Sequence, residues 1–205
     1  LVKLLQVFEF AYENVEPITK LIIPEDLWEK ADESVRDVLL PFIDAARALF
    51  GNCSYATLAA EGLTTWREVF QVCQAAEIWS CHGQWIEKQR PTFGPGVRER
   101  FVKASAITAV ERDDAETLRK SIGERIFRLL RGGIILTPAV PSTALPLGFT
   151  GDKLNTFRDR ALEMLCPAGL AGLPQLVFPA GSIDGAPIGL SLIGMPGSEY
   201  LLLNL

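Results

Sequence analysis

The amino-acid sequence predicts an α/β fold in which helices pack on a small sheet. Segments with apolar residues at helical spacing fill most of residues 1–131. Short apolar runs that are rich in β-branched residues and bounded by glycine or proline dominate residues 132–205. The 205 residues are 48% hydrophobic and 22% charged, which is typical of a soluble globular protein with one sizeable core. We therefore expect a helix-rich part followed by a sheet-forming part.

The first elements are expected to be a helix, a short strand and a second helical region. In "KLLQVFEFAYENVEP", residues 3–17, apolar side chains recur at helical spacing and a proline ends the run. "TKLIIP", residues 19–24, is typical of a short strand. Residues 24–51 carry one apolar helical stripe, in which Pro41 favours a kink or break and Gly51 an end. This region predicts one long or two short surface helices.

Two further helices are expected in the middle of the chain. "TTWREVFQVCQAAEIWSCHGQWIEKQRP", residues 64–91, repeats the helical pattern, and Gly83 interrupts it near the end. After the turn "RPTFGPG", a helix should run from near Val97 to near Leu130 and be the longest element. The glycine pair at Gly132 and Gly133 follows, and we expect it to cap that helix.

The sheet-forming part should begin with a buried strand. "GGIILTPAVPS", residues 132–142, is a short apolar run that Pro138 closes. "NTFRDRALEMLCPAGLAG", residues 155–172, is expected to be helical as far as Pro167. A strand followed by a helix is the repeating unit of α/β proteins.

Two more strands and the start of a helix complete the prediction. "LPQLVFPAG", residues 173–181, and "PIGLSLIG", residues 187–194, are short strands, and the turn "SIDGA" around Asp184 and Gly185 should join them. "SEYLLLNL", residues 198–205, begins a helix. The chain starts at Leu1 rather than at a methionine, so we expect a piece of a longer protein.

Charge and cysteine usage exclude several classes of partner. The net charge of −5 argues against a phosphate-backbone footprint, so we expect no nucleic-acid partner. No apolar run reaches the ~20 residues that span a bilayer, and "LVKLLQVFEF" lacks the features of a signal peptide, so we expect no membrane partner. The four cysteines lack C-x-x-C spacing, which disfavours zinc. They are expected to be small buried hydrophobes in a reducing compartment, which favours the cytoplasm.

Residues that could form a hydrolytic triad are scarce. His82 is the only histidine, and the sequence has no G-x-S-x-G motif. Ser191 comes nearest to such a motif, but its neighbours predict a strand. Cys81 and His82 are adjacent in a predicted helix, so their side chains should point about 100° apart. We expect His82 to be structural, and a Ser-His hydrolase of unrelated design remains an alternative hypothesis.

Cofactor and metal motifs are also missing. The sequence contains neither G-x-G-x-x-G after a strand nor G-x-x-x-x-G-K-[ST]. Two carboxylate pairs lie in charge-rich segments that are predicted to be helical, namely Asp113 with Asp114 and Glu29 with Glu33. We expect these side chains to be solvated. We therefore expect no metal and no organic cofactor.

The C-terminal third carries a resemblance to a known family. "AGLAGLPQLVFPAGSIDGAPIGLSLIG", residues 168–194, resembles the C-terminal segment of the amidase signature family, as do "ILTPAVPS" and "ALEMLCPAG". "HGQWIEKQRPTFGPGVRERF" is similar to the indoleacetamide hydrolase branch. The resemblance implies an amidase-signature-type α/β fold, with a mixed central sheet flanked by helices. Residues 1–205 would be one partial amidase domain that contains only the C-terminal part of this fold.

The resemblance also implies a function. Members hydrolyse amides through a serine, a second serine with a cis peptide and a lysine, which lie in an upstream lysine region and a "GGSSGGS"-like stretch. Neither feature can be matched here, so no catalytic residue is assigned. We expect the C-terminal part of an amidase that acts on a carboxamide such as indole-3-acetamide through an acyl-enzyme, and that needs the missing N-terminal half. A non-catalytic scaffold or binding protein with the amidase fold is the alternative.

One wall of the substrate site is expected within this chain. In the family, the helix before the "GxPxxxxPxG" strand ends beside the acyl group of the substrate. Leu165, Cys166 and Gly169 are the nearest matches and are our candidate substrate-binding residues. The alternative for Leu165 and Cys166 is that they belong only to the core. The sequence leaves the oligomeric state open, and a homo-oligomer is compatible with it.

Overall fold

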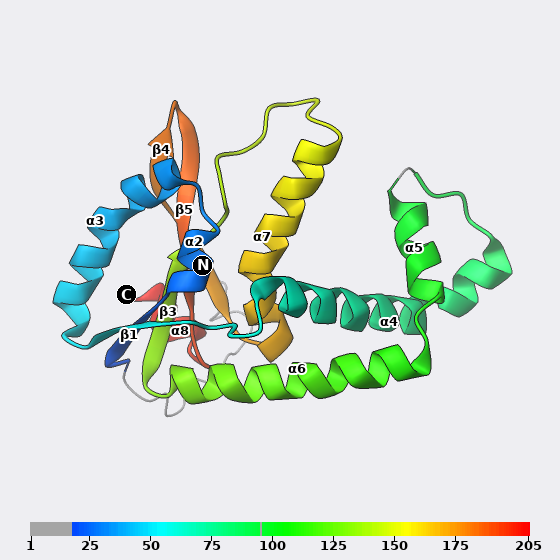
Figure 1. The fold of residues 1–205 in the computed structure, drawn as a ribbon, viewed down its shortest axis with the longest axis horizontal. Coiled ribbons are helices and arrows are strands. Elements are labelled where there is room, and N and C mark those ends of the chain that lie inside the picture. The colour runs from blue at the N-terminus through cyan, green and yellow to red at the C-terminus, as the bar shows by residue number, and fades with distance from the viewer. Residues whose placement is uncertain (1–17, 95) are drawn as a thin grey trace.

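The computed structural model describes residues 18–94 and 96–205, which form helices around a mixed five-stranded sheet (Figure 1). The strand order is β2-β1-β3-β5-β4. The strands are β1 (Lys20–Pro24), β2 (Cys53–Ala56), β3 (Gly133–Pro138), β4 (Gln175–Ile183) and β5 (Ala186–Ile193). The predicted α/β class with a mixed sheet is confirmed. The helix expected over residues 3–17 lies outside the described residues.

Parallel and antiparallel pairing divide the sheet into two parts. β1 pairs in parallel with β2 and β3, and β5 is antiparallel to both β3 and β4. β1 and β3 are buried almost throughout, as expected for parallel strands that are covered on both faces. The expected hairpin turn is present, with Asp184 at φ 50° and Gly185 at φ 79°.

Helices cover both faces of the sheet. They are α2 (Glu25–Glu29), α3 (Glu33–Phe50), α4 (Leu63–Gln89), α5 (Val97–Ser105), α6 (Ala109–Leu130), α7 (Asp152–Ala171) and α8 (Glu199–Leu203). Successive strand residues point to opposite faces, so Ile22 and Ile135 pack with α4, α6 and α7, while Leu21 and Ile134 pack with α3 and α8. The sheet therefore separates two hydrophobic cores.

Residues 24–51 contain two helices, α2 and α3, which is one of the two expected arrangements, but the break between them lies at residues 30–32. α3 runs through Pro41 without a break, since its buried stripe of Val35, Leu39 and Ile43 continues past that residue. The boundary predicted at Pro167 was wrong, because packing outweighs the effect of proline there. α7 continues through Pro167 to Ala171. Pro167 removes one helical N–H, and the carbonyl of Glu163, four residues earlier, accepts a weak hydrogen bond from the Cys166 thiol instead (3.7 Å).

Two other expectations need correction in the middle of the chain. The helix expected from Val97 to Leu130 is two helices, because Thr108 caps a new helix and forms a capping box with Glu111. Gly83 does not interrupt α4, which is continuous to Gln89. The C-cap residue of α6 is Arg131, and Gly132 after it adopts a left-handed φ of 63° in the turn that leads into β3.

Strand β2 was not predicted from the sequence. Residues 53–56 are half-buried or exposed and lie at the sheet edge, so their apolar pattern is weak. Because β1 and β2 also precede residue 132, the sheet takes strands from both predicted parts. Within the described residues, no helix is both long and apolar enough to cross a membrane.

The cysteines only partly match their predicted burial. All four are free thiols, and Cys73 and Cys166 are buried as expected. Cys53 is half-buried and Cys81 is exposed on the outer side of α4. The helical stripe of α4 explains the difference, because Cys73 lies in line with Trp66 and Val69 whereas Cys81 does not.

Candidate functional site

The parallel strands β1 and β3 end on the same side of the sheet, which we call its carboxyl edge. α/β proteins commonly bind ligands beyond the carboxyl ends of such strands. β1 leads directly into α2, and β3 leads into the loop of residues 139–151. Trp28 Nε1 donates a hydrogen bond to the carbonyl of Leu136 (2.9 Å), and the Asp32 amide donates to the carbonyl of Pro141 (2.8 Å). These bonds fasten the corner between α2 and α3 to the end of β3.

A buried carboxylate joins three helices near this edge. Glu163, on α7, is only 5% exposed. Its Oε2 lies 2.6 Å from Nζ of Lys30, which follows α2. Its Oε1 accepts a hydrogen bond from Thr64 Oγ1 (2.8 Å) and lies 3.3 Å from Arg67 Nη1, both on α4. Every oxygen of this carboxylate therefore has a partner.

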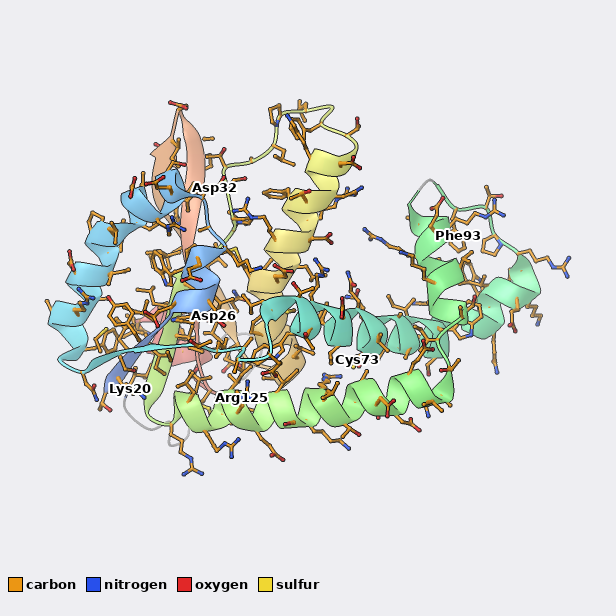
Figure 2. The ribbon with its side chains drawn as sticks, in the orientation of Figure 1. Lys20, Asp26, Asp32, Cys73, Phe93 and Arg125 are labelled. Carbon is orange, nitrogen blue, oxygen red and sulfur yellow. The ribbon has the colours of Figure 1, made fainter. Side chains whose placement is uncertain are left out.

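Two further ion pairs extend the group around Glu163. Arg160 Nη2 donates to Asp32 Oδ1 (2.6 Å), and Arg160 Nε donates to the carbonyl of Lys30 (3.2 Å). Arg67 Nη1 also lies 3.5 Å from Asp159 Oδ2. Figure 2 places Asp32 at the corner that faces α7. We call the group the charged cluster, and its members are Lys30, Asp32, Thr64, Arg67, Asp159, Arg160 and Glu163.

The environment of Glu163 keeps this side chain ionised. Burial alone would raise the pKa of the carboxyl. The hydrogen bonds from Lys30 and Thr64 and the positive charges of Lys30 and Arg67 outweigh burial, so the pKa of Glu163 lies below its usual range. A general acid needs a raised pKa, which this carboxyl does not have. The geometry suits a group that positions helices rather than one that transfers protons.

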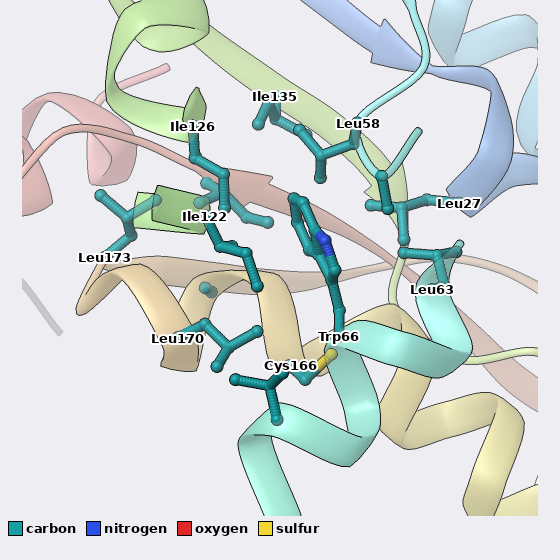
Figure 3. Close-up of a cluster of buried hydrophobic side chains, with 14 of the residues drawn as sticks. Leu27, Leu58, Leu63, Trp66, Ile122, Ile126, Ile135, Cys166, Leu170 and Leu173 are labelled. Carbon is teal, nitrogen blue, oxygen red and sulfur yellow. The ribbon is translucent and has the colours of Figure 1, made fainter. Parts of the chain in front are cut away.

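Cys166 lies one helical turn after Glu163, in the core. It is 1% exposed and packs in the cluster that contains Trp66, Ile122 and Leu170 (Figure 3). Burial, followed by the charge of Glu163, raises the pKa of the Cys166 thiol to about 12. The thiolate is the reactive form of cysteine, so this thiol is a poor nucleophile at neutral pH.

The other two candidate substrate-binding residues differ from Cys166. Leu165 is half-buried, and Gly169 is exposed. Gly169 borders a cavity of about 90 Å³ that Phe70, Cys73 and Arg119 also line. A Cβ added at Gly169 would lie 2.8 Å from Phe70 Cε2, so only glycine fits there without movement of the ring. The structure therefore brings Gly169, but not Cys166, to a cavity, and their role in substrate binding stays a prediction.

The residues considered for a triad are far from such a constellation. His82 is exposed and makes an edge contact with Phe101, with ring centroids 6.4 Å apart. Ser191 is buried in β5, where its Oγ accepts a hydrogen bond from Gln175 Nε2 (2.6 Å). Among the described residues, no hydrogen bond joins His82 and Ser191. Ser191 lies in a strand, as expected, and the structural role of His82 stays a prediction.

The remaining carboxylate predictions concern the helix surfaces. Asp113, Asp114, Glu29 and Glu33 are exposed, as expected. Within residues 18–94 and 96–205, no group of three or more His, Cys, Asp or Glu side chains could hold a metal ion. Glu163 is not among the site residues predicted from the sequence, although a signal was present. Glu163 lies three residues before Cys166 on the inward side of α7, where a charged residue requires a buried partner.

Comparisons with known proteins agree with this fold. The profile of the Amidase family matches residues 29–203. "Amidase 1" of Oryza sativa subsp. japonica is 33% identical over 138 residues, which are 66% of this chain and 32% of that protein. "Outer envelope protein 64, chloroplastic" of Arabidopsis thaliana is 28% identical over 137 residues, which are 66% of this chain and 23% of that protein.

A solved structure described as an amidase has a similar fold. Its TM-score is 0.76 at 24% identity, and the match covers 96% of this chain and 48% of that one. The chain thus spans less than half the length of each of these proteins.

Proposed function

Because the chain belongs to the amidase family, we propose that the intact protein hydrolyses a carboxamide to a carboxylic acid and ammonia. The observation that carries the proposal is the family match, which covers residues 29–203 and so includes most of both hydrophobic cores. The relative from rice that is named Amidase 1 adds support at 33% identity. This chain would supply part of the sheet and its covering helices, together with one wall of the substrate pocket.

The proposed chemistry uses a nucleophile outside this chain. The hydroxyl oxygen of a serine in the N-terminal half bonds to the amide carbon and gives up its proton to a base, which passes a proton to the amide nitrogen; the C–N bond then breaks and the nitrogen leaves as ammonia. Water then attacks the acyl-enzyme ester and releases the acid and the serine. The charged cluster acts only indirectly in this scheme, because it holds α7 against α4 and the end of β3. Precise placement of such walls is a large part of enzymatic rate enhancement.

The proposed substrate class is an arylacetamide such as indole-3-acetamide. Support comes from residues 82–101, "HGQWIEKQRPTFGPGVRERF", which are similar to the indoleacetamide hydrolase branch. We further propose that Leu165, Cys166 and Gly169 form the acyl-side wall, with Gly169 nearest the substrate because it borders a cavity. The remaining N-terminal half of the polypeptide is the proposed partner, and the cytoplasm, compatible with four free thiols, is the proposed location.

A non-catalytic scaffold that keeps the amidase fold is the second candidate. One relative at 28% identity is named an outer envelope protein rather than an amidase. In addition, neither Ser191 nor His82 forms a hydrogen bond with the other among the described residues. This candidate requires that the intact polypeptide lacks amide hydrolysis altogether.

The decisive test measures ammonia release by the intact protein. The substrates are indole-3-acetamide, phenylacetamide and propionamide, and hydroxylamine is added in parallel to trap an acyl-enzyme as a hydroxamate. We expect ammonia and hydroxamate from the aryl amides. Release of neither product from any of the three amides, by a folded protein, would instead favour the scaffold.

Two variants of the intact protein refine the test. Gly169→Val should lower kcat/KM for indole-3-acetamide more than for propionamide, by ~10-fold or more, because the added side chain narrows the wall. His82→Gln is the matched control and should change the rate of the chemical step less than ~10-fold. Equal losses on both amides for Gly169→Val would place the wall elsewhere.

A further inference from the structure

The end of the molecule farthest from the sheet carries a surface that the proposed function does not use. α5 stands at the far ends of α4 and α6, away from the strands (Figure 1), and Phe93 lies in the loop before it (Figure 2). Phe93 stacks on Phe101 with ring centroids 4.6 Å apart and contacts Trp85 edge-on. These aromatic contacts fix α5 against the end of α4. We call residues 85–118 the tip.

A basic segment of the tip comprises residues 85–94 and 96–105. Between residues 85 and 105 there are five exposed cations but only two acidic residues, Glu87 and Glu99. The cations are Lys88, Arg90, Arg98, Arg100 and Lys103. None of the five takes part in an ion pair with another described residue. This concentration of positive charge occurs in a chain whose net charge is −5.

The adjoining part of the tip is acidic. The first turns of α6 carry four exposed carboxylates, Glu111, Asp113, Asp114 and Glu116. Arg112 is the one cation between residues 109 and 118, and it is paired with Asp113 at 2.8 Å. Segments of opposite charge therefore adjoin on one end of the molecule, without neutralising each other through ion pairs in the described chain.

Apolar side chains are exposed among these charges. Trp85 is 50% exposed, Val102 60% and Val110 69%. Val97 and Leu118 are also largely exposed. Large apolar side chains gathered at one end of a molecule and rimmed by charge are typical of protein–protein contact sites.

We propose that two copies of this chain associate through their tips. In a two-fold symmetric contact the same surface serves on both subunits, so the basic segment of each copy can face the acidic segment of the other. The apolar residues Trp85, Val102 and Val110 would then be buried between the copies. A second copy satisfies both charged segments at once. An anionic lipid or nucleic-acid surface would attract the basic segment but repel the adjoining carboxylates of α6.

The test is a charge exchange in the intact protein, followed by sedimentation velocity. One variant reverses the basic segment (Arg98→Glu with Lys103→Glu), and the other reverses the acidic segment (Asp114→Lys with Glu116→Lys). None of these four side chains forms an ion pair with a described residue. We expect each variant alone to dimerise at least ~10-fold more weakly than the unaltered protein, since like charges then face each other.

An equimolar mixture of the two variants should dimerise again, because both pairs of facing segments regain opposite charges. Lys153→Glu with Arg158→Glu, on exposed positions of α7, is the matched control for the variant of the basic segment, because it makes the same change in net charge, and it should leave the dimer intact. A monomeric unaltered protein would overturn the proposal. So would a dimer that resists both reversals, or a mixture that stays monomeric while both variants keep native circular dichroism. Amide hydrolysis plays no part in these readouts, so they are independent of the proposed function.

Discussion

Glu163 shows at the scale of one residue how a buried charge is accommodated. Its two oxygens contact Lys30, Thr64 and Arg67, and these partners come from two different segments of the chain. The sequence could have flagged Glu163, because it lies on the inward side of α7. Its partners could not have been predicted, since they are about 100 or more residues away along the chain and only the packed fold brings them near.

We predict that Glu163→Gln lowers the free energy of unfolding by about 1–3 kcal/mol. The amide keeps the size of the side chain and can bond to Thr64, but it leaves Lys30 and Arg67 without their shared anion. The cost falls short of that for a fully buried pair, because Lys30 is one-third exposed and Arg67 retains Asp159. Urea unfolding measures the difference. Glu124→Gln, an exposed carboxylate on α6, is the control and should change stability little.

The same carboxylate predicts a pH dependence. The pKa of Glu163 is lower in the folded state than in the unfolded chain, so folding favours the ionised form. The ionised carboxylate contributes to stability above the pKa that Glu163 has in the unfolded chain, which is about 4.3. This contribution is lost as the pH falls through the pKa that Glu163 has in the folded protein. The stability difference between the unaltered protein and Glu163→Gln should therefore shrink as the pH drops from 6 towards 3. A difference that stays constant across this range would contradict the assigned charge state.

The cysteines offer a chemical test of burial. Cys166 is 1% exposed and its pKa is raised to about 12, whereas Cys81 is exposed on α4. We predict that iodoacetamide at pH 8 alkylates Cys81 at least ~100-fold faster than Cys166 in the native protein, because the thiolate is the reacting form. Mass spectrometry of the two peptides provides both rates. Denaturation is the control and should bring the two rates close together.

Helices and strands are the scale at which the sequence was most informative. The β4–β5 hairpin was predicted well, since Asp-Gly supplies two residues that tolerate positive φ. The end of α7 was placed too early at Pro167, because local proline rules ignore the packing of Ala168 and Leu170. β2 was missed since an edge strand of four half-exposed residues has little apolar periodicity. Local signals thus worked where local geometry decides the structure.

The break between α5 and α6 leads to a prediction about one cap. Thr108 Oγ1 accepts a hydrogen bond from the Glu111 amide (3.2 Å), and the Glu111 carboxylate accepts one from the Thr108 amide (2.8 Å). Thr108→Ala removes the side-chain acceptor and should cost about 1 kcal/mol of stability. Thr117→Ala, an exposed threonine within the same helix, is the control. If both substitutions have equal effects in thermal unfolding, the capping box does not stabilise α6.

At the scale of the whole molecule, the charged cluster connects layers that the sheet otherwise separates. The α2–α3 corner belongs mainly to the core around Leu21 and Ile134, whereas α4 and most of α7 belong to the core around Ile22 and Ile135. Lys30 and Asp32 on one side reach Glu163 and Arg160 on the other, around the carboxyl edge of β1 and β3. The sequence predicted helices packed on a small sheet with one sizeable core, but the strand order, the division into two cores and this connection depend on long-range contacts that no local pattern encodes.

This arrangement predicts that Arg160 couples the two layers. Arg160→Ala removes the bonds to the carbonyl of Lys30 and to Asp32, which join α7 to the start of α3 across 128 and more residues of chain. Hydrogen exchange should therefore speed up both in residues 30–36 and in residues 155–163, because each segment loses its contact with the other. Arg158→Ala, exposed on the same helix, is the control and should affect neither segment beyond its own turn. Faster exchange confined to α7 would show that the corner between α2 and α3 is held by its bonds to Leu136 and Pro141 alone.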